Sequence, residues 1–206
     1  MSNIPDASSR SLSDSPRIFE NALLDRLSRI DHRVPPIVYG PVVAALLAWS
    51  GYRLGAPATL AGALIGYVAW TLTEYFGHRF VFHWEMTSPM GKRAHFLMHG
   101  IHHDYPSDPL RLVMPLLMSL PIMSLAALLI LSFAGAWGPP VLAGFIAGYV
   151  AYDMVHYHVH HAEPRTAFGR YLRRTHMLHH FRDPNTGYGV SAPWWDTMFG
   201  TAWKGG

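Results

Sequence analysis

Long stretches without a charged residue are the main pattern along this chain. Residues 34–52 and 54–73 contain no Asp, Glu, Lys or Arg, and Arg53 alone separates them. Each stretch is close to the ~20 apolar residues that a helix needs to cross a bilayer. A third uncharged stretch, residues 112–152, is about twice the length of one crossing at ~1.5 Å per residue. This third stretch must therefore fold back on itself.

A glycine- and proline-rich run, residues 135–140 (GAWGPP), divides the third stretch. Two glycines and a Pro pair end one helix, and a proline close to the first turn can begin the next. The pattern therefore predicts an all-α integral membrane protein with four transmembrane helices. They are expected near residues 37–53, 57–76, 112–134 and 139–156.

The charged residues decide between a membrane protein and a soluble helical core. Only 14% of the residues are charged, against roughly 25% in an ordinary soluble domain, so a soluble fold would lack the polar surface to cover four such helices. Of the 16 Lys and Arg, all but Arg53 fall on one side of the predicted helices. By the positive-inside rule this side, with both termini, is cytoplasmic. The formal charge of +3 is then a topological signal, and no nucleic-acid partner is expected.

The same topology predicts the domain organisation. Residues 1–33 form a cytosolic N-terminal segment, and residues 34–206 form a membrane domain whose cytosolic cap comes from 77–111 and 157–206. The first sixteen residues are rich in Ser, Asp and Pro and are expected to be largely disordered.

Apolar residues recur at helical spacing after Pro16. These residues are Phe19, Leu23, Leu27 and Ile30. They predict a short amphipathic helix, which either lies at the membrane interface or packs on the cytosolic cap.

Histidine is the residue type whose distribution points to chemistry. The chain has 14 histidines and no cysteine, which excludes thiolate zinc modules, thiolate iron–sulfur clusters and disulfides. Apart from His32, every histidine lies at or after the cytoplasmic end of the second or fourth predicted helix. Ten of them form four spaced groups: His78 and His83 (HRFVFH), His99, His102 and His103 (HGIHH), His156 and His160 (HYHVH), and His176, His179 and His180 (HMLHH).

The spacing within these groups suits metal binding. Residues i, i+3 and i+4 share a helix face, so their imidazoles can converge on one point. His78 and His83 are about 140° apart on an ideal helix; one metal could bind both only if the helix ended or bent, so we expect them to serve different metals. Ten ligands over two metals give five nitrogens each, which leaves one open position in six-coordinate geometry.

The ligand type leaves iron, zinc, copper and nickel open. Neutral imidazoles around two cations also require a bridging solvent species or a nearby carboxylate. Glu74 and Asp153 each stand about one turn before a grouped histidine. We expect these two carboxylates, together with His161, to hydrogen bond the ligands and orient them.

Longer motifs around these histidines resemble the fatty acid hydroxylase superfamily of integral-membrane non-haem di-metal oxygenases, and within it the fatty acid 2-hydroxylases. Sterol desaturase relatives share the later histidine groups but open with a shorter first spacing, and carotenoid hydroxylases are more distant. The similarity covers roughly residues 60–201 in register. It is carried by HRFVFHWE at 78–85, HFLMHGIHHDYPSDPLRLVMP at 95–115, YDMVHYHVHH at 152–161, HMLHHF at 176–181 and GYGVSAPWWDTMFGT at 187–201.

The resemblance implies four transmembrane helices, a cytosolic histidine-rich helical cap and a di-iron centre that uses dioxygen to hydroxylate carbon 2 of a long acyl chain. It implies that all ten grouped histidines are ligands and act in catalysis through the metals, and that zinc can fill the site in purified protein. Eukaryotic members often carry an N-terminal haem-binding electron-carrier domain, for which too few residues precede the first crossing here. We therefore expect a separate electron-transfer protein, and a bacterial inner membrane as the preferred location.

A long-chain acyl lipid would enter from the bilayer and lie between the transmembrane helices and the cap. Candidates for holding its polar head are Tyr105, Asp108, Arg111, Tyr152, Tyr188 and Trp195. Two other functions stay open. A sterol or carotenoid hydroxylase or desaturase of the same superfamily would differ in the lipid it modifies. A non-catalytic membrane metal-binding protein would bind metal without consuming oxygen.

Overall fold

The computed structural model describes residues 11–12, 14–84 and 86–205, so most of the segment expected to be disordered lies outside the described residues. The part of the chain that it describes contains helices and no strand, which confirms the all-α prediction for those residues. The α-helices are α1 (Ala22–Leu27), α2 (Val34–Leu54), α3 (Ala56–Gly77), α4 (Pro89–His95), α5 (Ile101–Asp104), α6 (Leu116–Phe133), α7 (Gly138–His161), α8 (Ala167–Phe181) and α9 (Trp194–Met198). Two π-helical turns, His78–Phe82 and Phe96–Gly100, extend α3 and join α4 to α5.

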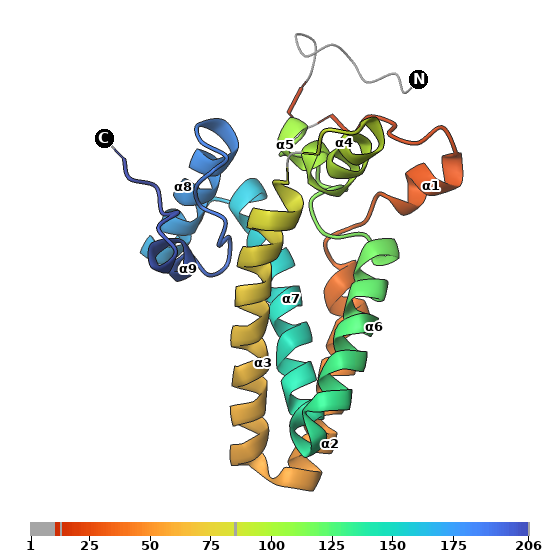
Figure 1. The fold of residues 1–206 in the computed structure, drawn as a ribbon, viewed down its shortest axis with the longest axis vertical. Coiled ribbons are helices and arrows are strands. Elements are labelled where there is room, and N and C mark those ends of the chain that lie inside the picture. The colour runs from red at the N-terminus through yellow and green to blue at the C-terminus, as the bar shows by residue number, and fades with distance from the viewer. Residues whose placement is uncertain (1–10, 13, 85, 206) are drawn as a thin grey trace.

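Four long helices, α2, α3, α6 and α7, run along the long axis of the molecule, and the shorter helices gather at one end of them (Figure 1). Within the described residues, three segments are long and apolar enough to cross a membrane: Val34–Leu54, Ala56–Phe82 and Leu116–Phe133. The fourth predicted crossing corresponds to α7, which is the most buried of the long helices and ends in a histidine-rich turn. The count of four crossings stays a prediction.

The third long helix begins later than the sequence pattern predicts. α6 starts at Leu116 instead of residue 112, directly after Pro115. Leu112 and Val113 lie in the preceding loop, where both are buried against Ile30 of the N-terminal segment. Their apolar character therefore reflects packing of this loop and not an additional helical turn.

Close backbone contact between α3 and α7 sets the position of both helix ends. A Cβ atom added at Gly144 would lie 1.8 Å from the carbonyl oxygen of Ala63, and one at Gly66 would lie 1.9 Å from that of Val141. Small residues four positions apart allow such approach between membrane helices. This packing fixes the histidine-bearing ends of α3 and α7 beside each other.

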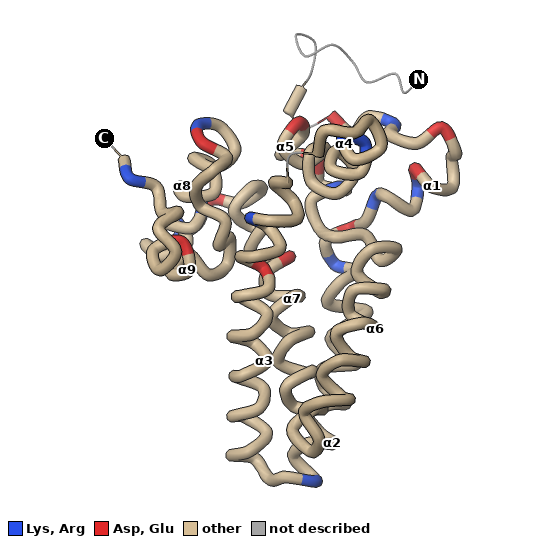
Figure 2. The backbone as a smooth tube through the Cα atoms, viewed as in Figure 1, with Lys and Arg blue, Asp and Glu red and all other residues tan. Residues whose placement is uncertain are grey.

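Charge is distributed as unevenly in space as along the sequence. Figure 2 shows the Lys, Arg, Asp and Glu residues at the end that carries the short helices, whereas the opposite end has a single basic position at the α2–α3 turn. That position is Arg53. The end with the short helices, formed by residues 11–33, 78–115 and 162–205 as far as they are described, is called the cap below.

The N-terminal segment holds a shorter helix than its apolar spacing predicts, because α1 covers only six residues. Ile18 is buried against Ile101 and Tyr105 of the cap, with Phe19 packed beside them. Leu23 and Leu27 remain 64% and 47% exposed. The apolar positions thus do not share one continuous helix face: the first packs on the cap, and the middle ones remain exposed.

Candidate metal centre

All ten grouped histidines meet at the junction of the long helices and the cap, where they form two groups of five. Within each group, one ligand atom from every residue lies within 4.8 Å of the others, so each group could hold a metal ion. Group one is His78, His83, His99, His103 and His179, and group two is His102, His156, His160, His176 and His180.

The spacing of the ring nitrogens fits this interpretation. In octahedral coordination with metal–nitrogen bonds of ~2.1 Å, neighbouring ligand nitrogens are roughly 3 Å apart. His179 adds a second observation, because its Nε2 is buried with no hydrogen-bond partner among the described residues. The Nε2–Nε2 distances in group one are 3.1 Å for His78–His99, 3.2 Å for His78–His83 and 2.9 Å for His99–His103. In group two they are 2.9 Å for His102–His156, 2.8 Å for His160–His176 and 3.1 Å for His176–His180.

The spacing of each H-x-x-H-H motif predicts that its three imidazoles converge on one point. The structure instead divides each motif between the two groups. His99 and His103 belong to group one, while His102 belongs to group two. The second motif divides in the opposite sense, because His179 joins group one and its two neighbours in the motif join group two. On a helix, residues i and i+4 are about 40° apart, whereas i+3 and i+4 are about 100° apart. Each motif can therefore reach two metals from its two flanks.

The assignment of His78 and His83 to different metals is also wrong. Both side chains lie in group one, with their Nε2 atoms 3.2 Å apart. The helix changes to a π-helical turn over His78–Phe82, and the backbone N–H of His83 donates to the carbonyl of His78 at 3.2 Å. An i→i+5 hydrogen bond widens the turn, so two residues five apart return to the same face.

Backbone carbonyls, and not the expected carboxylates, orient two of the histidines. His78 Nδ1 lies 2.7 Å from the Tyr188 carbonyl oxygen, and His179 Nδ1 lies 2.7 Å from that of Thr186. When Nδ1–H donates to a carbonyl, the Nε2 lone pair is left for a metal. Gly187 between them has φ of 72°, a conformation that glycine adopts readily. Together with Asp183, Pro184 and Asn185 just before it, this glycine is a local sequence signal for a turn here.

The carboxylates have other partners. The Glu74 carboxylate accepts hydrogen bonds from the backbone N–H of Ser191, at 2.8 Å, and from its hydroxyl. Asp153 accepts a weak bond from the backbone N–H of Met114 at 3.5 Å. The His161 ring lies tilted against that of Tyr157, with ring centroids 4.4 Å apart, and His161 belongs to neither group. Glu74 therefore supports the ligands indirectly, by holding the loop whose carbonyls orient them.

The cap histidines are held in their neutral form. Burial, reinforced by neighbouring histidines, lowers the pKa of His83 to about 3 and that of His103 to about 2. Burial also lowers the pKa of His179 to about 4. The same causes place the pKa values of His99 and His102 well below the usual one. Neutral imidazole is the form that binds metals, so these side chains are available as ligands at neutral pH.

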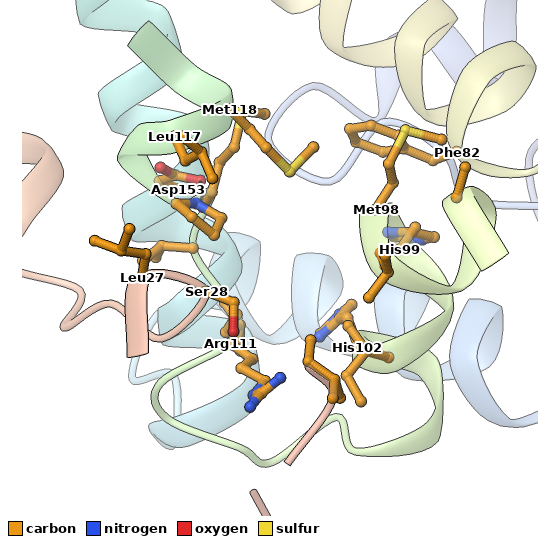
Figure 3. A pocket seen from close by; sticks show the side chains of 18 of the residues that line it. Leu27, Ser28, Phe82, Met98, His99, His102, Arg111, Leu117, Met118 and Asp153 are labelled. Atoms are coloured by element: carbon orange, nitrogen blue, oxygen red, sulfur yellow. Dashed lines mark hydrogen bonds between the residues drawn. The ribbon is translucent and has the colours of Figure 1, made fainter. Parts of the chain in front are cut away.

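An apolar cavity of about 370 Å³ opens beside both histidine groups. His99 of group one and His102 and His156 of group two line it, together with residues of the N-terminal segment, the π-helical turns, α4, α5, α6, the loop before α6 and α7. In Figure 3, His99 and His102 lie across the cavity from Leu117 and Asp153. Of the six candidates for holding a substrate head, only Arg111 and Tyr152 line this cavity.

The other four candidates have structural contacts. Tyr105 is buried against Ile18 and Ile101. Asp108 accepts a hydrogen bond from the Leu110 backbone at 2.9 Å. Tyr188 supplies the carbonyl to His78, and Trp195 donates from Nε1 to the Thr71 hydroxyl at 3.1 Å.

Comparison with known proteins identifies the family. A family model described as fatty acid hydroxylase matches residues 63–201, which include all ten grouped histidines. The chain belongs to the fatty acid hydroxylase family. This confirms the resemblance inferred from the sequence motifs and the oxidoreductase class.

Individual members of the fatty acid hydroxylase family are similar over most of this chain. The dihydroceramide fatty acyl 2-hydroxylase FAH2 of Arabidopsis thaliana is 38% identical over 191 residues, which are 91% of this chain and 80% of that protein. The fatty acid 2-hydroxylase of Homo sapiens is 34% identical over 90% of this chain and 56% of its own length. A solved structure of full-length scs7p, in which only the hydroxylase domain is visible, superposes with a TM-score of 0.84 at 33% identity, over 90% of this chain and 71% of that one.

Proposed function

We propose that this chain is a membrane-embedded fatty acyl 2-hydroxylase that uses two iron ions and dioxygen to hydroxylate carbon 2 of a long acyl chain. The observation that carries the proposal is the position of two five-histidine groups at the wall of one apolar cavity. The relatives that are named 2-hydroxylases support carbon 2 of an acyl chain over a sterol or carotenoid as the site of reaction.

Each histidine group would hold one iron through its five imidazoles. Bound iron supplies redox chemistry with dioxygen that no protein side chain can provide, and it is needed to oxidise an unactivated C–H bond. Five nitrogen ligands leave one position of a six-coordinate ion open. Because His99, His102 and His156 line the cavity, iron held by the two groups would lie beside the space proposed for the substrate. Zinc fits the same ligands but is redox-inactive.

The cavity would place the substrate. Its apolar lining includes Leu117, Met118 and Phe82, and such a lining favours an alkyl chain over water. Leu117 at the start of α6 is 61% exposed, so one rim of the cavity is continuous with the surface that a membrane would cover. An acyl chain could then enter sideways from the bilayer, with its head at the cap.

The membrane orientation follows from the charges. We propose four crossings, with α7 as the fourth, and a cytoplasmic cap, because the basic residues gather at the cap end. Electrons would come from a separate carrier protein on the cytoplasmic side. A bacterial inner membrane stays a prediction, and the relatives reported above are eukaryotic.

The test measures product formation by the purified chain in lipid nanodiscs. The protein is loaded with iron or, as a matched control, with zinc. The iron form, given ¹⁸O₂, an N-acyl lipid and a reductant-coupled electron carrier, is expected to yield a 2-hydroxy acyl product containing ¹⁸O. The zinc form is expected to yield none. A hydroxylated sterol or carotenoid, with no hydroxy acyl product, would replace the proposal with the related lipid oxidase. Metal binding without oxygen consumption would replace it with a metal-binding protein.

A further inference from the structure

Arg111 is a buried cation with an unused hydrogen-bond donor. Its side chain is 2% exposed and lies in the loop before α6. Nη2 donates to Asp25 Oδ1 at 3.2 Å, and Nε lies 3.6 Å from Asp108 Oδ2. Nη1 is also buried, and it has no hydrogen-bond partner among the described residues. A buried donor without a partner is costly, so this nitrogen is expected to meet an acceptor in the working protein.

The cavity is where such an acceptor could bind. Arg111 lines the same cavity as His99, His102 and His156. Figure 3 shows Arg111 and His102 at one end of this cavity, with Leu117, Met118 and Phe82 toward the other. The groups of an acyl substrate follow the same order as these cavity residues. Its polar carbonyl group comes first, then carbon 2, and then an apolar tail.

We propose that Nη1 of Arg111 donates a hydrogen bond to the carbonyl oxygen of a neutral acyl group, and that this contact selects carbon 2 for reaction. The proposal rests on the 2-hydroxylase function proposed above and assigns the residue that determines its position specificity. With the carbonyl held at Arg111, carbon 2 lies one bond from the anchored group, and the tail runs past Met118 and the exposed Leu117 and Leu27.

The charges around Arg111 favour a neutral acyl group over a free carboxylate. Asp25 also pairs with Arg29, whose Nε and Nη2 donate to Asp25 Oδ2 at 3.2 Å and 3.1 Å. Asp25 and Asp108 therefore balance Arg29 and Arg111, and the four side chains carry no net charge. A carboxylate would add an uncompensated negative charge to this network, and burying such a charge is unfavourable. The carbonyl oxygen of an amide or ester satisfies Nη1 without that penalty.

The N-terminal segment takes part in this arrangement. Asp25 lies in α1 and accepts hydrogen bonds from the backbone N–H of Ile18, at 2.8 Å, as well as from Arg111. The segment thus forms one wall of the cavity and at the same time holds the guanidinium in place. Arg93 anchors the same segment from outside the cavity, by donating to the Ile18 carbonyl oxygen.

Two double variants separate the binding role from the structural one. Asp25→Asn/Arg111→Met removes the proposed donor and keeps the network neutral. The control, Asp31→Asn/Arg33→Met, makes the same two kinds of substitution at an exposed ion pair that does not line the cavity. Both are compared with the unchanged chain in nanodiscs, by thermal-shift titration with N-methylhexadecanamide, hexadecanoic acid and hexadecane. Turnover is measured in parallel, and the position of the new hydroxyl group is read by mass spectrometry.

The unchanged chain is expected to bind the amide more tightly than the acid or the alkane. Loss of a charge-assisted hydrogen bond predicts a drop of about 10- to 100-fold in amide affinity for the Arg111 variant, with alkane affinity retained and hydroxylation spread to carbons beyond carbon 2. The Asp31→Asn/Arg33→Met control should keep the amide preference and the 2-hydroxy product. An unchanged amide affinity in the Arg111 variant, an equal loss of amide and alkane affinity, or an equal effect of both variants would overturn the proposal.

Failure of the 2-hydroxylase function is distinguishable from failure of this inference. Ligand binding requires no turnover, so an amide preference that depends on Arg111 with no hydroxylated product would retain the binding site and reject the reaction. Preference for hexadecanoic acid over the amide would reject the neutral-substrate argument.

Discussion

His102 and His103 are adjacent in sequence, yet their imidazoles lie in different metal-binding groups. His102 Nε2 is 2.9 Å from that of His156, and His103 Nε2 is 2.9 Å from that of His99. The two groups nevertheless touch, because the ring of His103 stacks on that of His180 with centroids 4.2 Å apart. The same short helices therefore shape both groups, and movement of one helix would change both.

Single histidine variants should separate the two groups. His103→Ala is expected to weaken metal binding in group one, and His102→Ala in group two, because each removes one of five nitrogens from only its own group. The metal-to-protein ratio of purified protein, measured by inductively coupled plasma mass spectrometry, should fall from about two toward about one in each variant. Loss of both metals in both variants would contradict two separable sites.

The loop that orients His78 and His179 should be sensitive at Gly187. Gly187→Ala forces a side chain into a positive-φ conformation, costing about 1–2 kcal/mol, and places a Cβ 3.2 Å from the Thr175 carbonyl oxygen. We expect lower metal occupancy of group one and a lower Tm. Gly200→Ala is the matched control, because Gly200 has the same φ of 72° but open space around its Cβ position. Equal metal loss in both variants would argue against an orienting role for residues 186–188.

The contact between α3 and α7 should tolerate no added methyl group. Gly144→Ala would put a Cβ 1.8 Å from the Ala63 carbonyl oxygen, so the two helices would have to separate. Overpacking of this kind costs about 1–3 kcal/mol or more, and we expect little folded protein in membranes by size-exclusion chromatography. Gly40→Ala in α2 meets nothing within 4 Å and should behave like the unchanged chain. Normal folding of Gly144→Ala would contradict the close helix packing.

The Asp25 network predicts a pH-dependent contribution to stability. Burial raises the pKa of Asp25, but hydrogen bonds from the backbone N–H of Ile18 and Phe19 and from Arg111 outweigh it, so the pKa lies below its usual value. The ionised carboxylate therefore stabilises the fold fully above its unfolded pKa of about 3.9, and this contribution is lost as the pH falls through the lowered folded value.

Asp25→Asn tests that contribution. At neutral pH it should lower the unfolding free energy by about 1.5–3 kcal/mol, the typical value for a hydrogen bond to a charged group. The difference in Tm between the variant and the unchanged chain should shrink as the pH falls below about 4. A difference in Tm that stays constant between pH 7 and pH 3 would show that ionisation of Asp25 is not responsible.

Sequence alone could predict the long helices and the ten converging histidines, because uncharged runs and helical spacing are local properties. It could not predict how the histidines divide. Whether the i+3 member of an H-x-x-H-H motif turns to the same metal as its neighbours depends on the helices packed on either side. The five-residue spacing of His78 and His83 predicts the wrong division for a similar reason, because the angles of a regular α-helix do not apply where a π-helical turn forms.

The hydrogen-bond partners of His78 and His179 also could not be predicted from the sequence. Residue type favoured Glu74 and Asp153, whereas the atoms that meet His78 and His179 are backbone carbonyls, which every residue carries. The sequence does not distinguish Arg111 from the other five candidates for holding the polar head of the substrate. What distinguishes it is a position in the cavity lining combined with an Nη1 that has no hydrogen-bond partner among the described residues.

The central claim is that the two histidine groups together support acyl 2-hydroxylation. Its most direct test is mass spectrometry of hydrolysed lipids from cells that express the unchanged chain or His179→Ala/His180→Ala, which removes one ligand from each group, at matched membrane levels. We expect 2-hydroxy acyl chains with the unchanged chain and none above background with the variant. Equal amounts of 2-hydroxy acyl chains in both would contradict it.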